Sequence, residues 1–253
     1  YCGEKVAVGT AGGGFCLMTE GLSFAGMAEL PVVIVMGQRP GPSTGLPTYS
    51  CQTELQFVLS AGQGEFTRFV IAPGDAEEAY SAAQLAMRIS WKYQIPSIVL
   101  TDKAMAEGSY SFDVETCGEI AEGSPLLWDK KGIYRRYMDT DTGVSALAFP
   151  GTKDAVIKVN SYEHDEAGIS TEDPAVTVKM QDKRLRKEKY LSLELEGYDC
   201  VKVYGNKDST VALLCWGSNK GVCVEVAKTL GLKVIQPVAM APFPVKQFRA
   251  ALN

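Results

Sequence analysis

Short apolar runs alternate with helical patterns through the first hundred residues. Four runs bounded by turn residues predict strands buried in a sheet: Lys5–Thr10, Val32–Met36, Arg68–Ile71 and Pro96–Thr101. Between them, helices are predicted from about Phe15 to Ala28, over Thr53–Ser60 and over Ala76–Lys92. The last follows a Pro-Gly-Asp sequence that suits a helix N-cap. Because strands that alternate with helices form parallel sheets, the chain is predicted to be an α/β protein with a doubly wound parallel sheet.

The pattern changes after residue 103. Ser124–Asp154 is rich in turns, and its basic and aromatic stretch Lys130–Tyr137 is interpreted as a solvated loop. Ala175–Glu196 predicts a long polar helix that links two domains. A second α/β pattern follows, with a strand over Thr210–Gly217, a tight turn at Ser218–Gly221, a helix over Val222–Leu230, a strand over Lys233–Met240 and a further helix from Val245. We expect the chain to be a portion of a longer protein, with sequence missing at both ends.

Composition narrows the classes of function. The 253 residues carry a net charge of −5, which argues against a nucleic-acid or anionic-membrane surface. No apolar run approaches the ~20 residues that a membrane span needs, and no signal peptide is visible, so a cytoplasmic protein is expected. The seven scattered cysteines form no Cys-x-x-Cys pair and there is one histidine. A metal or iron–sulfur site built by this chain alone is therefore not expected.

The loop Gly37–Thr48, directly after the second predicted strand, is the most informative segment. Its three prolines and three glycines disfavour helix and strand, so the chain leaves the sheet as a rigid loop. Ligands of open α/β sheets bind where strands end. The loop presents one guanidinium, Arg39, with the hydroxyls of Ser43 and Thr44, and such a fork of donors suits a carboxylate or a phosphate. The alternative is an arginine that only holds a tight turn.

Two other segments carry candidate chemistry. The glycine-rich turn Gly9–Phe15 lacks the Gly-x-Gly-x-x-Gly spacing of a nicotinamide site, although its small residues would admit a flat ligand and Thr10 offers a hydroxyl. His164 is one of four consecutive ionisable residues, but adjacent positions point different ways, so a solvated or hydrogen-bonded loop is favoured over a metal or proton-transfer cluster. The pair Glu77 and Glu78 is interpreted as acids at the positive end of their helix.

Several segments together resemble the α subunit of 2-oxoacid:ferredoxin oxidoreductases, and most closely the 2-oxoglutarate type. The segments are Thr10–Glu20, Gly26–Val35, Gln38–Thr48, Pro150–Thr152, Glu163–Gly168 and Pro242–Pro244. The resemblance implies a pyrimidine-binding domain of the thiamine-diphosphate enzymes over residues 1–172, a linker helix over 173–197 and part of a transketolase C-terminal-like domain over 198–253. It also implies that Arg39, Ser43 and Thr44 bind the substrate. Thr10, Gly12 and Gly13 would line the aminopyrimidine side of the cofactor.

The implied activity is the CoA-dependent oxidative decarboxylation of a 2-oxoacid, with reduction of ferredoxin. Thiamine diphosphate would be shared with a β subunit that holds the diphosphate, Mg²⁺ and an iron–sulfur cluster. The family's glutamate for the aminopyrimidine and its Tyr-Pro-Ile-Thr-Pro motif lie upstream of the glycine turn and are not in this chain, so no catalytic residue is assigned. Ala11–Gly14 also replaces the usual Ser-Gly-Pro-Gly or Ser-Gly-Gly-Gly, which removes a hydroxyl.

Two alternatives stay open. The first is a scaffold or regulatory subunit of such a complex, and the second is a nicotinamide-dependent dehydrogenase. The role of His164 is open between a hydrogen bond at a domain interface and a contact with substrate.

Overall fold

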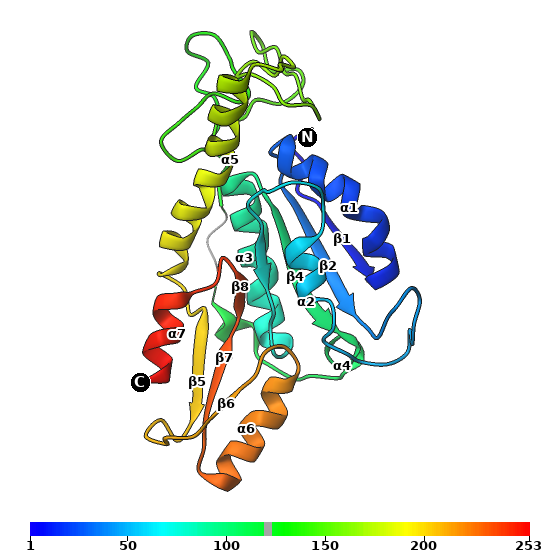
Figure 1. The fold of residues 1–253 in the computed structure, drawn as a ribbon. Helices are drawn as coiled ribbons and strands as arrows, with labels where there is room; N and C mark the ends of the chain where they lie inside the picture. The colour runs from blue at the N-terminus through cyan, green and yellow to red at the C-terminus, as the bar shows by residue number, and fades with distance from the viewer. Residues whose placement is uncertain (119–122) are drawn as a thin grey trace.

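The larger sheet has five strands and is parallel except at one edge. The computed structural model describes residues 1–118 and 123–253 (Figure 1). The strands stand in the order β1 (Ala7–Ala11), β2 (Val32–Gln38), β4 (Pro96–Asp102), β3 (Phe69–Ile71) and β8 (Ala239–Ala241). The first four are mutually parallel and β8 is antiparallel to β3. The predicted parallel sheet is confirmed.

Helices cover both faces of this sheet. On one face α1 (Gly12–Met27) and α2 (Leu55–Ser60) bury Phe15, Leu22 and Val58 against strand residues such as Met36. On the other face lie α3 (Ala76–Tyr93) and the end of α5 (Pro174–Leu195). The short α4 (Lys103–Glu107) and the 3₁₀ helix η1 (Val114–Cys117) follow β4. None of the described helices is both long and apolar enough to cross a membrane.

A second, smaller unit follows α5. Its sheet has the order β5 (Val201–Gly205), β7 (Lys233–Pro237) and β6 (Ala212–Leu214), with β7 antiparallel to β5 and parallel to β6. The helix α6 (Asn219–Leu230) packs on it through Ala227, and α7 (Val245–Leu252) ends the described chain.

The structure corrects two predictions for this unit and adds one strand. The single strand predicted over Lys233–Met240 is divided, because β7 ends at Pro237 and β8 then joins the larger sheet. A proline has no N–H to continue a ladder, which accounts for the break. The tight turn predicted at Ser218–Gly221 is wrong, since α6 begins at Asn219, and β5 was not predicted at all.

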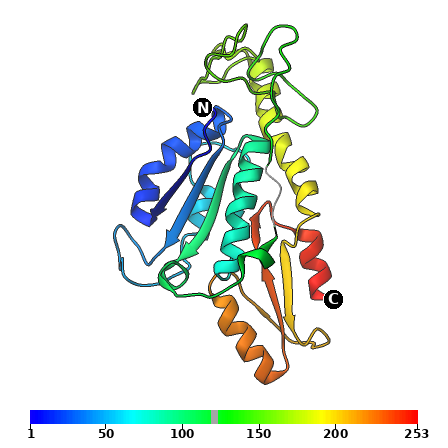
Figure 2. The same ribbon diagram turned by 180° about the vertical axis from the view of Figure 1, so that it is seen from behind.

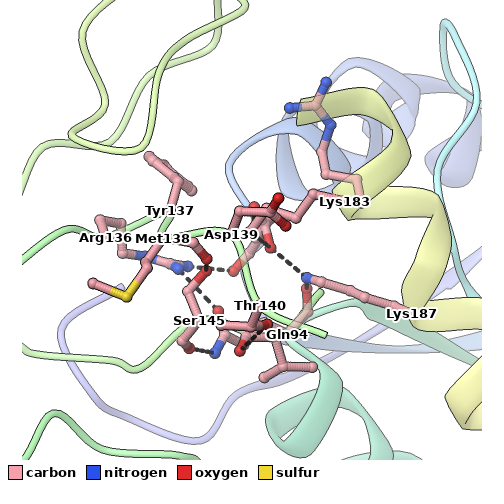
Figure 3. A network of polar contacts seen from close by, with 12 residues as sticks. Gln94, Arg136, Tyr137, Met138, Asp139, Thr140, Ser145, Lys183 and Lys187 are labelled. Carbon is pink, nitrogen blue, oxygen red and sulfur yellow. Dashed lines mark hydrogen bonds and ion pairs between the residues drawn. The ribbon is translucent and has the colours of Figure 1, made fainter. Parts of the chain in front are cut away.

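Segment 123–172 wraps around the N-terminal part of α5, at the end of the molecule away from the second unit (Figures 1 and 2). The carboxylate of Glu29, the second residue after α1, is buried against α5. It accepts from Lys183 at 2.7 Å and from Lys187 at 2.6 Å, while Arg136 donates to the Glu29 carbonyl oxygen at 2.6 Å. Lys187 and Arg136 also bond Gln94 (Figure 3).

The structure differs in part from two interpretations of the sequence, although residues 130–133 are exposed as a solvated loop would be. Lys183 and Lys187 lie on the buried face of α5, so this helix is not simply a polar link. In the stretch Lys130–Tyr137, the side chains of Arg136 and Tyr137 are buried against the sheet unit and are not in a solvated loop. The spacing of charged residues along a helix does not show whether they face solvent or a carboxylate from elsewhere in the chain. The pairing of the α5 lysines with Glu29 could therefore not be predicted from the sequence.

Lys187 should make stability depend on pH. Burial lowers the pKa of Lys187 to about 7, although Glu29 opposes the shift. Between pH 7 and the ordinary lysine pKa the unfolded chain binds a proton that the folded chain has lost, so the free energy of unfolding rises with pH. Denaturant unfolding at pH 7 and pH 9 should show the wild type gaining about 1–2 kcal/mol relative to Lys187→Met.

The exposed Lys189 on the same helix provides the control, because Lys189→Met should leave the pH dependence of the wild type unchanged. Equal pH dependence in the wild type and Lys187→Met would contradict the assignment.

Candidate functional site

The carboxyl ends of β1, β2 and β4 meet at one edge of the larger sheet. Ala11 pairs with Gly37 and Gln38 pairs with Asp102, so the residues that follow these strands are neighbours. The arrowheads of β2 and β4 point toward the end of the molecule where α6 lies (Figure 1). The predicted ligand-binding loops are therefore gathered at this carboxyl edge.

The glycine-rich segment forms the first turn of α1 rather than a turn before it. The helix begins at Gly12, three residues earlier than predicted. A Cβ placed on Gly14 would lie 2.3 Å from Thr10 Oγ1, so the Thr10 hydroxyl occupies the space of a side chain there. A Cβ on Gly12 would lie 3.3 Å from Glu54 Oε1, and one on Gly13 would lie 3.8 Å from Arg39 Nη2. Glycine at position 12 allows Glu54 to approach the helix backbone closely, whereas Arg39 lies at ordinary contact distance from Gly13.

Two hydrogen bonds hold the backbone of Arg39, and one donor of its side chain has no partner among the described residues. Its N–H donates to Glu54 Oε1 at 3.1 Å, and Thr53 Oγ1 donates to its carbonyl oxygen at 3.3 Å. Its Nε is buried and has no hydrogen-bond partner among the described residues. A buried donor without a partner costs about 1–3 kcal/mol, which a bound acceptor would offset. This geometry does not favour the alternative in which Arg39 only holds a tight turn.

Ser43 and Thr44 lie on the exposed part of the same loop. Ser43 has a φ of 55°, and its carbonyl oxygen would lie 3.7 Å from a Cβ on Gly13. The structure therefore brings Arg39, Gly12, Gly13 and the backbone of Ser43 together. Thr10 lies beside them against Gly14, while the Thr44 side chain is exposed to solvent.

Three polar residues at this edge were missed in the sequence. Gln38 is 2% exposed, and its Oε1 has no hydrogen-bond partner among the described residues. Asp102 accepts from Met105 N at 3.1 Å and from the Ser218 hydroxyl. Gln38 and Asp102 lie one or two residues after the strands predicted over Val32–Met36 and Pro96–Thr101, and they are the last residues of β2 and β4. That position could have revealed them. Glu54 could not be found in this way, because its contact with Arg39 depends on the path of the loop.

His164 lies in segment 123–172 and not at the carboxyl edge. It is fully buried, its ring centroid is 4.0 Å from that of Tyr137, and its Nδ1 is 2.8 Å from the Tyr162 carbonyl oxygen. Burial lowers the pKa of His164. The solvated interpretation is wrong, and the hydrogen-bonded one describes the residue. In the described parts of the chain, no three His, Cys, Asp or Glu residues gather as a metal site.

Glu78 joins the two units of the fold. Its Oε2 accepts from Gly74 N at 2.7 Å and from Gln236 Nε2 at 2.8 Å. Its Oε1 accepts from Lys220 at 2.7 Å, and from Lys202 and Tyr204 at 3.1 Å each. Burial opposes ionisation, but these cations and hydrogen bonds lower the pKa of Glu78 to about 2. The interpretation of Glu78 as an acid at the N-terminus of its helix was therefore incomplete, because Glu78 also binds residues of the second unit.

Comparison with known proteins identifies the family. The family described as "Pyruvate flavodoxin/ferredoxin oxidoreductase, thiamine diP-bdg" matches residues 1–183. The chain belongs to this family. The resemblance to 2-oxoacid:ferredoxin oxidoreductase α subunits is thereby confirmed, and the parallel sheet with its glycine turn lies within a thiamine-diphosphate-binding domain.

Named relatives from this oxidoreductase family align in sequence with almost the whole of this chain. The chain is 39% identical over 260 residues to the 2-oxoacid:ferredoxin oxidoreductase subunit alpha of Saccharolobus solfataricus, covering 99% of this chain and 41% of the relative. It is 28% identical to the 2-oxoglutarate synthase subunit KorA of Methanocaldococcus jannaschii, over 96% of this chain and 65% of that protein. The chain thus spans less than half of the first relative's length.

A solved structure of the same family has a very similar fold. It is the 2-oxoglutarate:ferredoxin oxidoreductase from Magnetococcus marinus with 2-oxoglutarate, coenzyme A and succinyl-CoA bound. The TM-score is 0.87 at 32% identity, over 99% of this chain and 44% of that chain.

The close approach of Thr10 to Gly14 can be tested by a double-mutant cycle. Gly14→Ala should lower the free energy of unfolding by about 1–3 kcal/mol, because the new Cβ meets Thr10 Oγ1. In a Thr10→Ala background the same change should cost nothing or stabilise the helix. Denaturant unfolding of the four chains measures the difference.

Gly21→Ala in the same helix is the matched control, since a Cβ there meets nothing within 4 Å. It should stabilise the chain by up to about 1 kcal/mol. Equal effects of Gly14→Ala in the two Thr10 backgrounds would show that the contact is not tight.

Proposed function

We propose that this chain is part of the α subunit of a CoA-dependent 2-oxoacid:ferredoxin oxidoreductase that acts on 2-oxoglutarate in the cytoplasm. The observation that carries the proposal is Arg39, whose guanidinium lies beside the glycine turn of α1 with a buried Nε that no described residue satisfies. The named relatives and the solved neighbour supply the reaction class, and the neighbour's bound 2-oxoglutarate supports the choice of substrate.

The residues present at the carboxyl edge fit one side of a thiamine-diphosphate site. Gly12 and Gly13 have no side chains, and Glu54, Arg39 and the Ser43 carbonyl oxygen lie beside them, so a flat ring at this edge would meet these groups next to the first turn of α1. Thr10 offers a hydroxyl next to that turn. Thiamine diphosphate, when bound, supplies the carbon nucleophile that makes decarboxylation of a 2-oxoacid possible. The diphosphate, Mg²⁺ and an iron–sulfur cluster would be held by a β subunit, which would pass electrons to ferredoxin.

The contribution of this chain is to position the substrate. Arg39 would bind a carboxylate through its guanidinium, and Glu54 and Thr53 hold the Arg39 backbone at the end of β2. The exposed hydroxyls of Ser43 and Thr44 would complete the carboxylate site from the same loop. Holding a reactant in one orientation is worth several kcal/mol of barrier, so the rigidity of this loop matters for catalysis.

Substitution of Arg39 tests the carboxylate site. In the complete α chain assembled with its β subunit, Arg39→Met should raise KM for the 2-oxoacid about 10- to 100-fold, because a hydrogen bond to a charged group is lost. Arg39→Lys keeps the charge without the planar fork and should give an intermediate KM. KM for CoA should not change.

Arg135→Met is the control, since Arg135 pairs with Glu166 in segment 123–172 at the other end of the molecule. An unchanged KM for the oxoacid in Arg39→Met would remove Arg39 from the substrate site.

A substrate panel tests the reaction and its specificity. The complete α and β chains would be supplied with thiamine diphosphate, Mg²⁺, CoA and an oxidised viologen, which changes colour on reduction. We expect CoA-dependent viologen reduction with 2-oxoglutarate to exceed that with pyruvate or 2-oxoisovalerate. Preference for either of these acids would overturn the choice of substrate. Absence of reduction with all three, from a complex that contains its cluster, would favour a scaffold subunit.

A further inference from the structure

The arginine loop, residues 39–54, is fastened to the second unit through Gln52. The Gln52 Nε2 donates to the Trp216 carbonyl oxygen at 2.9 Å, and its Oε1 accepts from Asn219 Nδ2 at 2.6 Å. Both ends of the amide are therefore used by residues at the start of α6. Both contacts span more than 160 positions in the sequence, so they form only when the two units pack together.

The segment that binds Gln52, residues 216–219, allows the Gln52 side chain to lie close to its backbone. Gly217 has a φ of 60°, and a Cβ there would lie 2.5 Å from Gln52 Nε2. The next residue, Ser218, donates its hydroxyl to Asp102 at the end of β4. Residues 216–219 thus bind two neighbouring parts of the carboxyl edge at once, the loop after β2 and the last residue of β4.

The residues that follow Gln52 reach Arg39 directly. Thr53 Oγ1 lies 3.3 Å from the Arg39 carbonyl oxygen and 2.9 Å from Glu54 Oε2. Glu54 Oε1 accepts from the Arg39 N–H at 3.1 Å. Residues 52–54 therefore connect the second unit to the backbone of Arg39. Gln52 contacts the second unit, and its neighbours Thr53 and Glu54 contact Arg39.

We propose that Gln52 is a positioning residue through which the second unit holds Arg39 in the geometry that binds the 2-oxoacid. The second unit then takes part in substrate recognition without touching the substrate. This inference rests on the proposed function of Arg39. A guanidinium that grips a carboxylate bidentately tolerates little displacement, so a loop that loses its fastening should bind the carboxylate more weakly.

The packing of the two units does not depend on Gln52 alone. Glu78 is bonded by Lys202, Tyr204, Lys220 and Gln236, and β8 pairs with β3 in the larger sheet. A weaker contact at Gln52 should therefore free the arginine loop while the units stay together. Lys202→Met is a matched control, because it weakens the contact between the units at a place that does not touch the loop.

The test uses the complete α and β complex with 2-oxoglutarate. Gln52→Ala should raise KM for the oxoacid about tenfold, as expected for the loss of two hydrogen bonds. It should leave kcat within about twofold and KM for CoA unchanged, because only the carboxylate anchor has moved. Lys202→Met should leave KM for the oxoacid at its wild-type value.

A double variant distinguishes positioning from a separate effect. If Gln52 acts through Arg39, Gln52→Ala should add nothing to the KM of Arg39→Met. Additive effects, an unchanged KM in Gln52→Ala, or an equal rise in Lys202→Met would each overturn the inference. Asn219→Ala removes one of the two bonds from an exposed position, so it serves if Gln52→Ala does not assemble, and it should raise the same KM by a smaller factor.

Failure of the proposed function has a different signature. If Arg39→Met itself leaves KM for the oxoacid unchanged, the carboxylate site lies elsewhere and the inference falls with it. If Arg39→Met raises KM and Gln52→Ala does not, only the role of Gln52 is wrong.

Discussion

Parallel strands must end at the same edge of their sheet, and the candidate site depends on that constraint. Three adjacent strands, β1, β2 and β4, deliver Thr10, the pair Gln38 and Arg39, and Asp102 to one place, in a register that their backbone hydrogen bonds determine. Arg39 then lies beside the glycine turn at the start of α1, with its Nη2 3.8 Å from a Cβ placed on Gly13. A ligand at this edge meets groups from several separate parts of the sequence, as is general for open α/β sheets.

Buried polar atoms without a partner among the described residues occur at both ends of the larger sheet, and they include His164 Nε2 and Arg186 Nε in and beside segment 123–172. At the end that carries segment 123–172, the Glu29 carboxylate is bonded by two lysines, and their charges, with that of Arg136, hold its pKa below the ordinary value despite burial. At the carboxyl edge, Gln38 Oε1 and Arg39 Nε are buried without partners among the described residues. At the carboxyl edge a bound ligand that completes the pairing would offset this local cost.

Local sequence patterns were sufficient to predict the four parallel strands of the larger sheet, but contacts between residues far apart in the sequence could not be predicted. The apolar runs, the Asp75 cap of α3 and the loop after β2 follow from nearby residues, so the parallel sheet and the position of Arg39 could be predicted. The burial of Lys187 could not, because it depends on Glu29, more than 150 positions away. The return of β8 to the larger sheet and the fastening of Gln52 by Trp216 and Asn219 have the same cause. Hydrogen bonds and strand pairs between the two units cannot be read from the sequence of either segment alone.

The central claim is that Arg39 and the glycine turn of α1 form one wall of a shared active site. The most direct measurement is an experimental structure of the complete α and β complex with thiamine diphosphate and 2-oxoglutarate bound. The account predicts an oxoacid carboxylate within hydrogen-bonding distance of the Arg39 guanidinium, with the aminopyrimidine ring against Gly12 and Gly13. An oxoacid bound at full occupancy with Arg39 directed away from it, or a ring that rests on other elements, would contradict the account.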